Sequence, residues 1–242
     1  MVTRAASQEV LRAALYDQWD VLLAALPGLD PTAPTGVDGW TVHQVHAHLT
    51  ATTAGLAQLL SAPGPAAPDS DLAGWAAALP GLAEVIAASV PEVADLESAV
   101  LQAKAALRAA DPDRNVQQRT GAHTLTDALL FRLIEGVVHG LDLGVAPARS
   151  ALREVVRALV QLLADTVPGH AVEVRVPPYA VTQCVAGPRH TRGTPPGTVE
   201  ADPVAWLLVA TGRLSWDDAV ASGQVRVRGD RADLREHLPL FT

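Results

Sequence analysis

The sequence predicts a two-domain α+β protein, with a four-helix bundle over residues 1–145 and a small α+β domain over residues 146–242. Two observations support the division. Apolar residues recur at helical spacing in segment after segment up to about residue 145, and short runs of alternating β-branched residues appear only after it. The chain has 242 residues, of which 49% are hydrophobic, enough to fill one core in each domain.

Four long helices are predicted in the first domain, each from a capping residue followed by an apolar stripe. Between the second and third, the segment from Asp71 to about Val90 is predicted to form short helical pieces interrupted at Pro80. The long helices are expected from a cap at Ser7 to about Ala25, from a cap at Thr41 to about Ser61, from Pro91 to the stop at Asp111, and after a cap at Thr124 or Thr126.

The second domain is predicted to mix helices and strands. Alternation in AVEVRV, AVTQCVA and QVRVRG favours strands, because their side chains would point to opposite faces of a sheet. The expected order is a helix at about 149–166, strands at 171–176 and 180–186, a loop at 187–197, a strand near 198–201, short helices at about 203–211 and 216–222, a strand at 224–229 and a last helix near 231–238.

Composition excludes several classes of function. The formal net charge is −8 and the pI is about 5.4, which argues against binding nucleic acid or an anionic membrane surface. No run approaches the roughly 18 apolar residues that a spanning helix needs, and the N-terminus lacks a continuous apolar signal region, so a cytoplasmic protein is expected. Cys184 is the single cysteine; it cannot form an intramolecular disulfide, and we predict that it is a small buried hydrophobic residue.

The segment FRLIEGVVHGLDL, residues 131–143, carries the candidate functional residues. Glu135 and His139 stand four residues apart and therefore share one helical face. In the second helix His48 shares its face with Val45 and Leu49, so it is expected to point inward. Two imidazoles and one carboxylate form a three-ligand set that leaves positions open on a divalent ion, as in catalytic sites.

A simpler interpretation stays open, because Glu–His pairs at this spacing also stabilise ordinary helix surfaces by a few tenths of a kcal/mol. The remaining histidines are expected to be solvated. Two of them, His43 and His46, lie off the apolar face of the second helix, and the other four are predicted in loops or near element ends: His123, His170, His190 and His237.

The motifs GWTVHQVHAHL and RLIEGVVHGLDL resemble those of the metal-binding domain of the mycothiol-dependent maleylpyruvate isomerase family, within the DinB-like superfamily of thiol-dependent transferases. The stretch DPVAWLLVATGRLSWDDAVASGQVRVRGD resembles the second, sterol-carrier-protein-like domain of that family. Matched residue by residue, the metal triad of the family falls on His48, Glu135 and His139. The resemblance implies a divalent ion, typically zinc, which binds the thiolate of mycothiol for attack on a small electrophilic substrate.

The resemblance also assigns roles around the triad. Arg213 matches a basic position of the family's second domain that is expected to face the active site, and it is the candidate catalytic residue. Arg132 and Asp142 are expected to orient Glu135 and His139 by hydrogen bonds. The family picture also includes a first-domain arginine for a dicarboxylate substrate, yet no Arg or Lys occurs between Arg12 and Lys104. A less acidic substrate is therefore expected.

Two alternatives from other classes remain. The chain could be a carrier of small apolar ligands, with a pocket in the second domain lined by Trp206, Leu207, Leu208 and Trp216, although such residues more often form a core. It could also be a protein of the same fold recruited for secondary-metabolite biosynthesis. The leading interpretation is a thiol-dependent transferase or isomerase with a small-molecule substrate.

Overall fold

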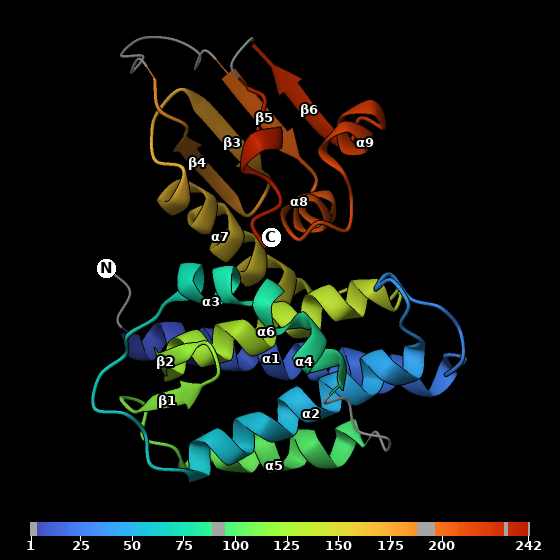
Figure 1. Cartoon of the computed structure of the whole chain (residues 1–242), viewed down its shortest axis with the longest axis vertical. Coiled ribbons are helices and arrows are strands. Elements are labelled where there is room, and N and C mark those ends of the chain that lie inside the picture. The colour runs from blue at the N-terminus through green and yellow to red at the C-terminus, as the bar shows by residue number, and fades with distance from the viewer. Residues whose placement is uncertain (1–3, 89–94, 188–196, 230–231, 242) are drawn as a thin grey trace. The chain divides into compact units, whose positions relative to one another are not determined.

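The protein forms two compact units, Met1–Ala151 and Leu152–Thr242, in a computed structural model that describes residues 4–88, 95–187, 197–229 and 232–241 (Figure 1). Among its described residues, the first unit has helices and one small hairpin, and the second unit contains a four-stranded sheet. The predicted α+β two-domain fold is therefore confirmed.

The first unit is built on four helices that pack in pairs. Helix α1 packs against α6 and α2 against α5, while α2 also contacts α6 and α1 contacts α5. The capping residue Thr41 begins α2, since its side chain accepts from the backbone N–H of Gln44 and the Gln44 side chain accepts in return. The helices of the bundle are α1 (Arg4–Ala25), α2 (Val42–Ser61), α5 (Leu96–Ala109) and α6 (Leu125–Asp142).

Short elements complete this unit. The chain after α1 makes a 3₁₀ turn, η1 (Leu26–Gly28), and the α2–α5 connection contains α3 (Leu72–Ala78), η2 (Pro80–Leu82) and α4 (Ala83–Ala88). Strands β1 (Asn115–Gln118) and β2 (Gly121–Thr124) form an antiparallel hairpin immediately before α6. Gly121, the first residue of β2 after the turn, has φ of +125°, a value that favours glycine.

In the second unit, helix α7 (Arg149–Thr166), which begins at the boundary, leads into a sheet of order β4-β3-β5-β6. The central pair β3–β5 is parallel and the outer pairs are antiparallel. Buried valines at 172, 174 and 176 alternate with less buried residues along β3, as the sequence pattern predicts. The remaining elements are β3 (Val172–Val176), β4 (Ala180–Cys184), β5 (Gly197–Ala201), α8 (Pro203–Ala210), α9 (Trp216–Ala221), β6 (Val225–Arg228) and η3 (Arg235–His237).

Several local predictions differ from the structure. The hairpin of residues 115–124 was not predicted, and the expected last helix at 231–238 is reduced to the single 3₁₀ turn η3 among its described residues. Helix α1 starts at Arg4, so Ser7 lies inside it rather than at its cap. Pro91, the expected start of the third long helix, lies outside the described residues, and Asp95 caps α5 by accepting from Ser98.

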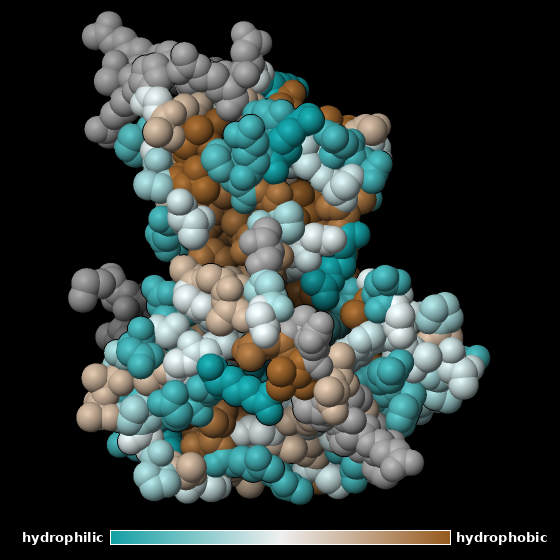
Figure 2. Space-filling model, viewed as in Figure 1, coloured by the Kyte–Doolittle hydropathy of each residue, from teal (hydrophilic) through white to brown (hydrophobic). Residues whose placement is uncertain are grey.

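In the part of the chain that the structure describes, no helix is both long and apolar enough to cross a bilayer. On the face of the first unit that Figure 2 shows, apolar side chains appear between hydrophilic ones.

Candidate active site

Helix α6 carries the candidate ligands Glu135 and His139. Its position is fixed by a cap at its N-terminus and by close packing against α1. Thr124 ends β2 and caps α6 in a reciprocal capping box with Asp127. On the adjoining face of the helix, next to Glu135 and His139 in sequence, Gly136 and Gly140 pack against Gln18 of α1, whose side chain donates to the Gly136 carbonyl at 3.0 Å. A Cβ at Gly140 would lie 3.1 Å from Gln18 Nε2. The glycines therefore let α1 approach α6 closely.

His48 of α2 is buried beside His139, as predicted. The residue is 6% exposed, and its ring lies edge-on to the rings of Trp40 and His139, with centroid distances of 5.7 and 4.9 Å. Burial lowers the pKa of His48 to about 4, and the nearby Glu135 carboxylate opposes that shift. At neutral pH the imidazole is uncharged, which is the form that binds metal ions.

Glu135 is held by charge rather than by an aligned hydrogen bond. Its Oε2 lies 2.8 Å from Nη1 of Arg132, and both side chains are largely buried. The same Oε2 atom is inaccessible to solvent and has no partner at hydrogen-bond geometry among the described residues. Arg132 also donates to the Thr52 carbonyl at 3.4 Å. The carboxylate is thus oriented by Arg132 and keeps lone pairs for another ligand.

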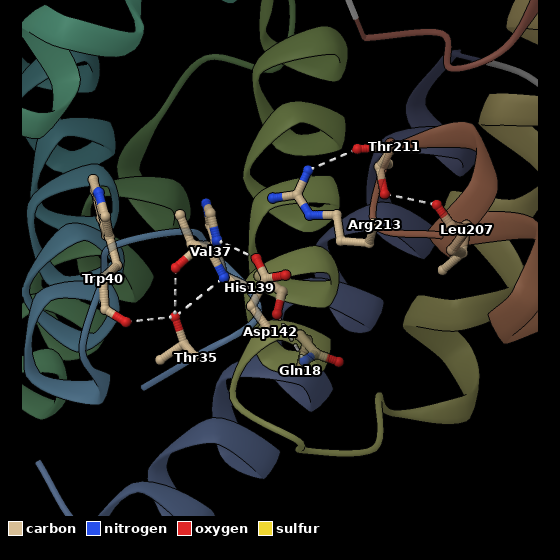
Figure 3. A network of polar contacts seen from close by, with 10 residues as sticks. Gln18, Thr35, Val37, Trp40, His139, Asp142, Leu207, Thr211 and Arg213 are labelled. Carbon is tan, nitrogen blue, oxygen red and sulfur yellow. Dashed lines mark hydrogen bonds and ion pairs between the residues drawn. The ribbon is translucent and has the colours of Figure 1, made fainter. Parts of the chain in front are cut away.

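His139 is oriented by Asp142, one helical turn further along α6 (Figure 3). The imidazole Nδ1 and Asp142 Oδ2 are 2.9 Å apart, and a carboxylate can only accept, so Nδ1 donates and the neutral ring keeps its lone pair on Nε2. The backbone of Asp142 is fixed in turn, because its carbonyl accepts from Gly36 N–H at 2.9 Å. Thr35 donates to the Trp40 carbonyl at 3.0 Å and so stabilises the loop that carries Trp40.

A cavity of about 610 Å³ opens next to these residues, entirely within the first unit. His48, Arg132 and Glu135 line one part of it. The rest is lined by α2, by the segment from α3 to α4, and by the hairpin turn with Arg119. Cavities of this size accommodate small molecules.

The described residues contain no three His, Cys, Asp or Glu side chains that are positioned, as they stand, to hold one ion. The chemistry of His48, Glu135 and His139 nevertheless suits a divalent ion such as zinc, since neutral imidazole and carboxylate are its usual donors besides thiolate. The buried, unaligned Oε2 of Glu135 is the observation in favour of that fit.

The predicted basic residue of the second unit, Arg213, lies after α8 and is exposed. Its Nη1 donates to the Thr211 carbonyl at 2.9 Å, and the Thr211 hydroxyl donates to the Leu207 carbonyl at 2.7 Å (Figure 3). The structure therefore describes five of the six predicted site residues together in the first unit, and Arg213 in the second. Its catalytic role stays a prediction.

His123 is fully buried, so the prediction of a solvated residue was wrong. It lies on β2, where its Nδ1 contacts the Ser70 carbonyl at 3.1 Å and its Nε2 contacts the Thr120 hydroxyl at 2.9 Å. Its ring meets the face of Phe131 edge-on at 4.9 Å. The unpredicted hairpin explains the error, because it places His123, which was expected in a loop, on a strand with its side chain in the core. His43 and His170 are exposed, as predicted, and His46 is partly buried.

Of the four apolar residues considered as a ligand pocket in the second unit, Trp206 and Leu207 lie in its core and Leu208 is partly buried. Trp206 and Leu207 are 1% and 0% exposed. A cavity of about 290 Å³ does exist there, but of the four candidate residues only Trp216 lines it. Cys184 is fully buried, and burial raises its thiol pKa to about 11, in agreement with the predicted inert role.

The fold and the residue set define a two-domain protein whose helical unit carries a largely buried His–Glu–His group beside a cavity of about 610 Å³. The family model described as mycothiol maleylpyruvate isomerase N-terminal domain matches residues 12–144, and the model described as bacterial SCP ortholog matches residues 148–240. The chain belongs to the mycothiol maleylpyruvate isomerase family, as its motifs suggested.

Two solved structures share this fold. A crystal structure of the mycothiol-dependent maleylpyruvate isomerase superposes with a TM-score of 0.60 at 16% identity, and a histidine-to-alanine mutant of it with 0.59 at 15%. Each comparison covers 93% of this chain and 92% of the isomerase chain. No curated protein sequence matches the chain.

Proposed function

We propose that the protein is a metal-dependent transferase or isomerase that uses a low-molecular-weight thiol of the mycothiol type against a small electrophilic substrate. The observation that carries the proposal is the convergence of His48, His139 and Glu135 beside a cavity, with Arg132 and Asp142 orienting two of the three. Membership of a family named for a mycothiol-dependent isomerase supports the choice of thiol.

The protein side chains would act mainly by holding groups in place. The imidazoles of His48 and His139 and the carboxylate of Glu135 would hold a divalent ion, typically zinc, which supplies a thiolate at neutral pH from a thiol whose ordinary pKa is about 8.5. Asp142 keeps the His139 lone pair on Nε2, and Arg132 holds the Glu135 carboxylate in one orientation. Trp40 packs against His48 and limits access of water to it. In this proposal Arg213 contacts the substrate.

The test is the metal content of protein purified without a metal-chelating tag, followed by titration with mycothiol. Wild type is expected to contain about one equivalent of divalent metal and to bind the thiol. His48→Ala and Glu135→Ala should each lose metal and thiol affinity by at least about tenfold, since each removes one of three ligands.

His43→Ala is the matched control, because it removes an exposed imidazole from the same helix. It should retain both metal and thiol, and circular dichroism should show that all variants are folded. Wild-type protein without stoichiometric metal, or His48→Ala with unchanged metal content, would contradict the proposal.

A further inference from the structure

The two helices that carry the candidate ligands belong to different helix pairs. Helix α2, which carries His48, packs mainly on α5, whereas α6, which carries Glu135 and His139, packs mainly on α1. The direct contact between α2 and α6 is smaller than either of these. The placement of His48 relative to the ligands of α6 is therefore not fixed by one tightly packed helix pair alone, and an element that contacts both helices would contribute to it.

The loop of residues 35–40, which precedes α2, makes both contacts (Figure 3). Near its end the ring of Trp40 lies edge-on to His48 of α2, with a centroid distance of 5.7 Å. Near its start the backbone N–H of Gly36 donates to the carbonyl of Asp142, the last residue of α6, at 2.9 Å. One short loop thus reaches a candidate ligand on α2 and the residue that orients a candidate ligand on α6.

Hydrogen bonds within the loop hold its shape. The Thr35 hydroxyl donates to the Trp40 carbonyl at 3.0 Å and accepts from the Val37 N–H at 3.2 Å. The backbone N–H groups of Thr35 and Trp40 donate to the Trp40 and Val37 carbonyls at 3.1 and 3.0 Å. These bonds flank Gly36 on both sides, so its backbone is held in place against α6.

Gly36 leaves no room for a side chain. An added Cβ would lie 2.9 Å from Oδ1 and 3.1 Å from Cα of Asp142, whereas unbonded carbon atoms pack at about 3.5–4.0 Å. The Cα belongs to the end of a helix, so the carboxylate is the group that would move. Its other oxygen, Oδ2, is the one that lies 2.9 Å from His139 Nδ1. The Asp142 side chain is only 1% exposed, and a side chain at position 36 would therefore displace the acceptor of His139.

We propose that Gly36 is a positioning residue: because it lacks a side chain, the loop of residues 35–40 closes on the Asp142 carboxylate, which keeps the His139 proton on Nδ1 and the lone pair on Nε2. A partner at the second nitrogen orients a metal-binding imidazole and fixes its tautomer. The inference rests on the proposed function only for the use of that lone pair, since the contacts among Gly36, Asp142 and His139 need no ion.

The tautomer of His139 is the readout that tests this proposal. We would record ¹⁵N NMR spectra of the histidine-labelled, metal-free full-length protein at about pH 8.5, where an ordinary imidazole is neutral, and assign the His139 signals by their loss in His139→Gln. Wild type should show a protonated Nδ1 and a bare Nε2. In Gly36→Ala both signals should move toward the average of the two tautomers, because Nδ1 loses its acceptor. Zinc titration of the same preparations should show affinity weakened about tenfold or more.

A second variant and a matched control accompany Gly36→Ala. Thr35→Val removes the hydroxyl that bonds on both sides of Gly36 and adds no atom at position 36. It should move the His139 signals in the same direction by a smaller amount, and it decides the question if Gly36→Ala does not fold. Gly28→Ala lies in the same connection between α1 and α2, where nothing is within 4 Å of the new Cβ, and it should change neither the tautomer nor the zinc affinity.

A merely structural role for Gly36 predicts a different result. It would lower the free energy of unfolding of the loop variants and leave the His139 tautomer as in wild type, which would overturn the proposal. A bare Nδ1 in wild type, or an equal shift of the signals in Gly28→Ala, would also overturn it. Wild-type protein that binds no zinc would contradict the proposed function instead, and the spectra of the metal-free protein would still decide the role of Gly36.

Discussion

Burial keeps two side chains uncharged at neutral pH by opposite shifts. It lowers the pKa of the His48 imidazole to about 4 and raises that of the Cys184 thiol to about 11. In both cases the charged form is disfavoured because the side chain is removed from water into the low-dielectric protein interior. For His48 the result is a free lone pair beside His139, whereas for Cys184 it is a thiol that does not ionise and cannot serve as a nucleophile.

The Cys184 thiol predicts a dependence of stability on pH. Its folded pKa is raised above the ordinary value of 9.0, so its neutral form contributes stability that is present below pH 9 and lost as the pH rises toward 11. The loss has an upper limit of about 2–3 kcal/mol. Urea unfolding of wild type and Cys184→Ala should therefore show a stability difference that narrows between pH 8 and pH 10.5. A constant difference would contradict the assignment.

At the scale of elements, helix α6 both carries the candidate ligands and packs closely against α1. One side carries Glu135 and His139, and the adjacent positions, Gly136 and Gly140, face Gln18 of α1. Gln18 is fully buried, and besides its bond to Gly136 it accepts from the Ala148 N–H at 3.0 Å. A side chain bonded at both ends cannot move aside easily.

Gly140→Ala should therefore destabilise the protein although alanine is the better helix former. Its Cβ would press on Gln18 Nε2 at 3.1 Å, and overpacking of about 1–3 kcal/mol exceeds the propensity gain of up to about 1 kcal/mol. Chemical denaturation should show a net loss of about 1 kcal/mol. Gly55→Ala in α2, where nothing lies within 4 Å of the new Cβ, should instead gain stability; a gain in both variants would refute the close-packing explanation.

How far the sequence predicts these elements depends on the range of the interactions involved. The cap at Thr41, one of the two alternatives for the cap of α6, and the inward direction of His48 all follow from local spacing, and the structure agrees with each. The hairpin does not follow, since its strands are four residues long and bind by contacts with Asp69 and α2 that are distant in sequence. Missing it also hid the burial of His123 and the position of Arg119. A turn signal was present in Thr120-Gly121.

At the scale of the whole molecule, every residue that we propose as a metal ligand lies in the unit Met1–Ala151, together with the groups that orient them. The hydrogen bonds of Gln18, Gly36 and Arg114 that support those residues are also internal to this unit. The second unit has its own sheet and its own buried core.

The fragment Met1–Ala151 should consequently bind metal with the stoichiometry of the full chain, and Leu152–Thr242 should bind none. Elemental analysis of both fragments, with circular dichroism to confirm folding, measures this. A folded first fragment that fails to bind metal while the full chain binds it would place an essential ligand in the second unit. Binding of an apolar probe by the second fragment alone would favour the carrier alternative.

Thr124 is both the last residue of β2 and the cap of α6, and this junction has an evolutionary consequence. Residues of the turn can be replaced without altering the register of the helix that begins five residues after Thr120. Substitutions at Gln118 and Arg119, which line the cavity, would therefore leave Glu135 and His139 in place. Insertions within β2 would be tolerated far less, because a shift of one residue reverses which side chains face the core.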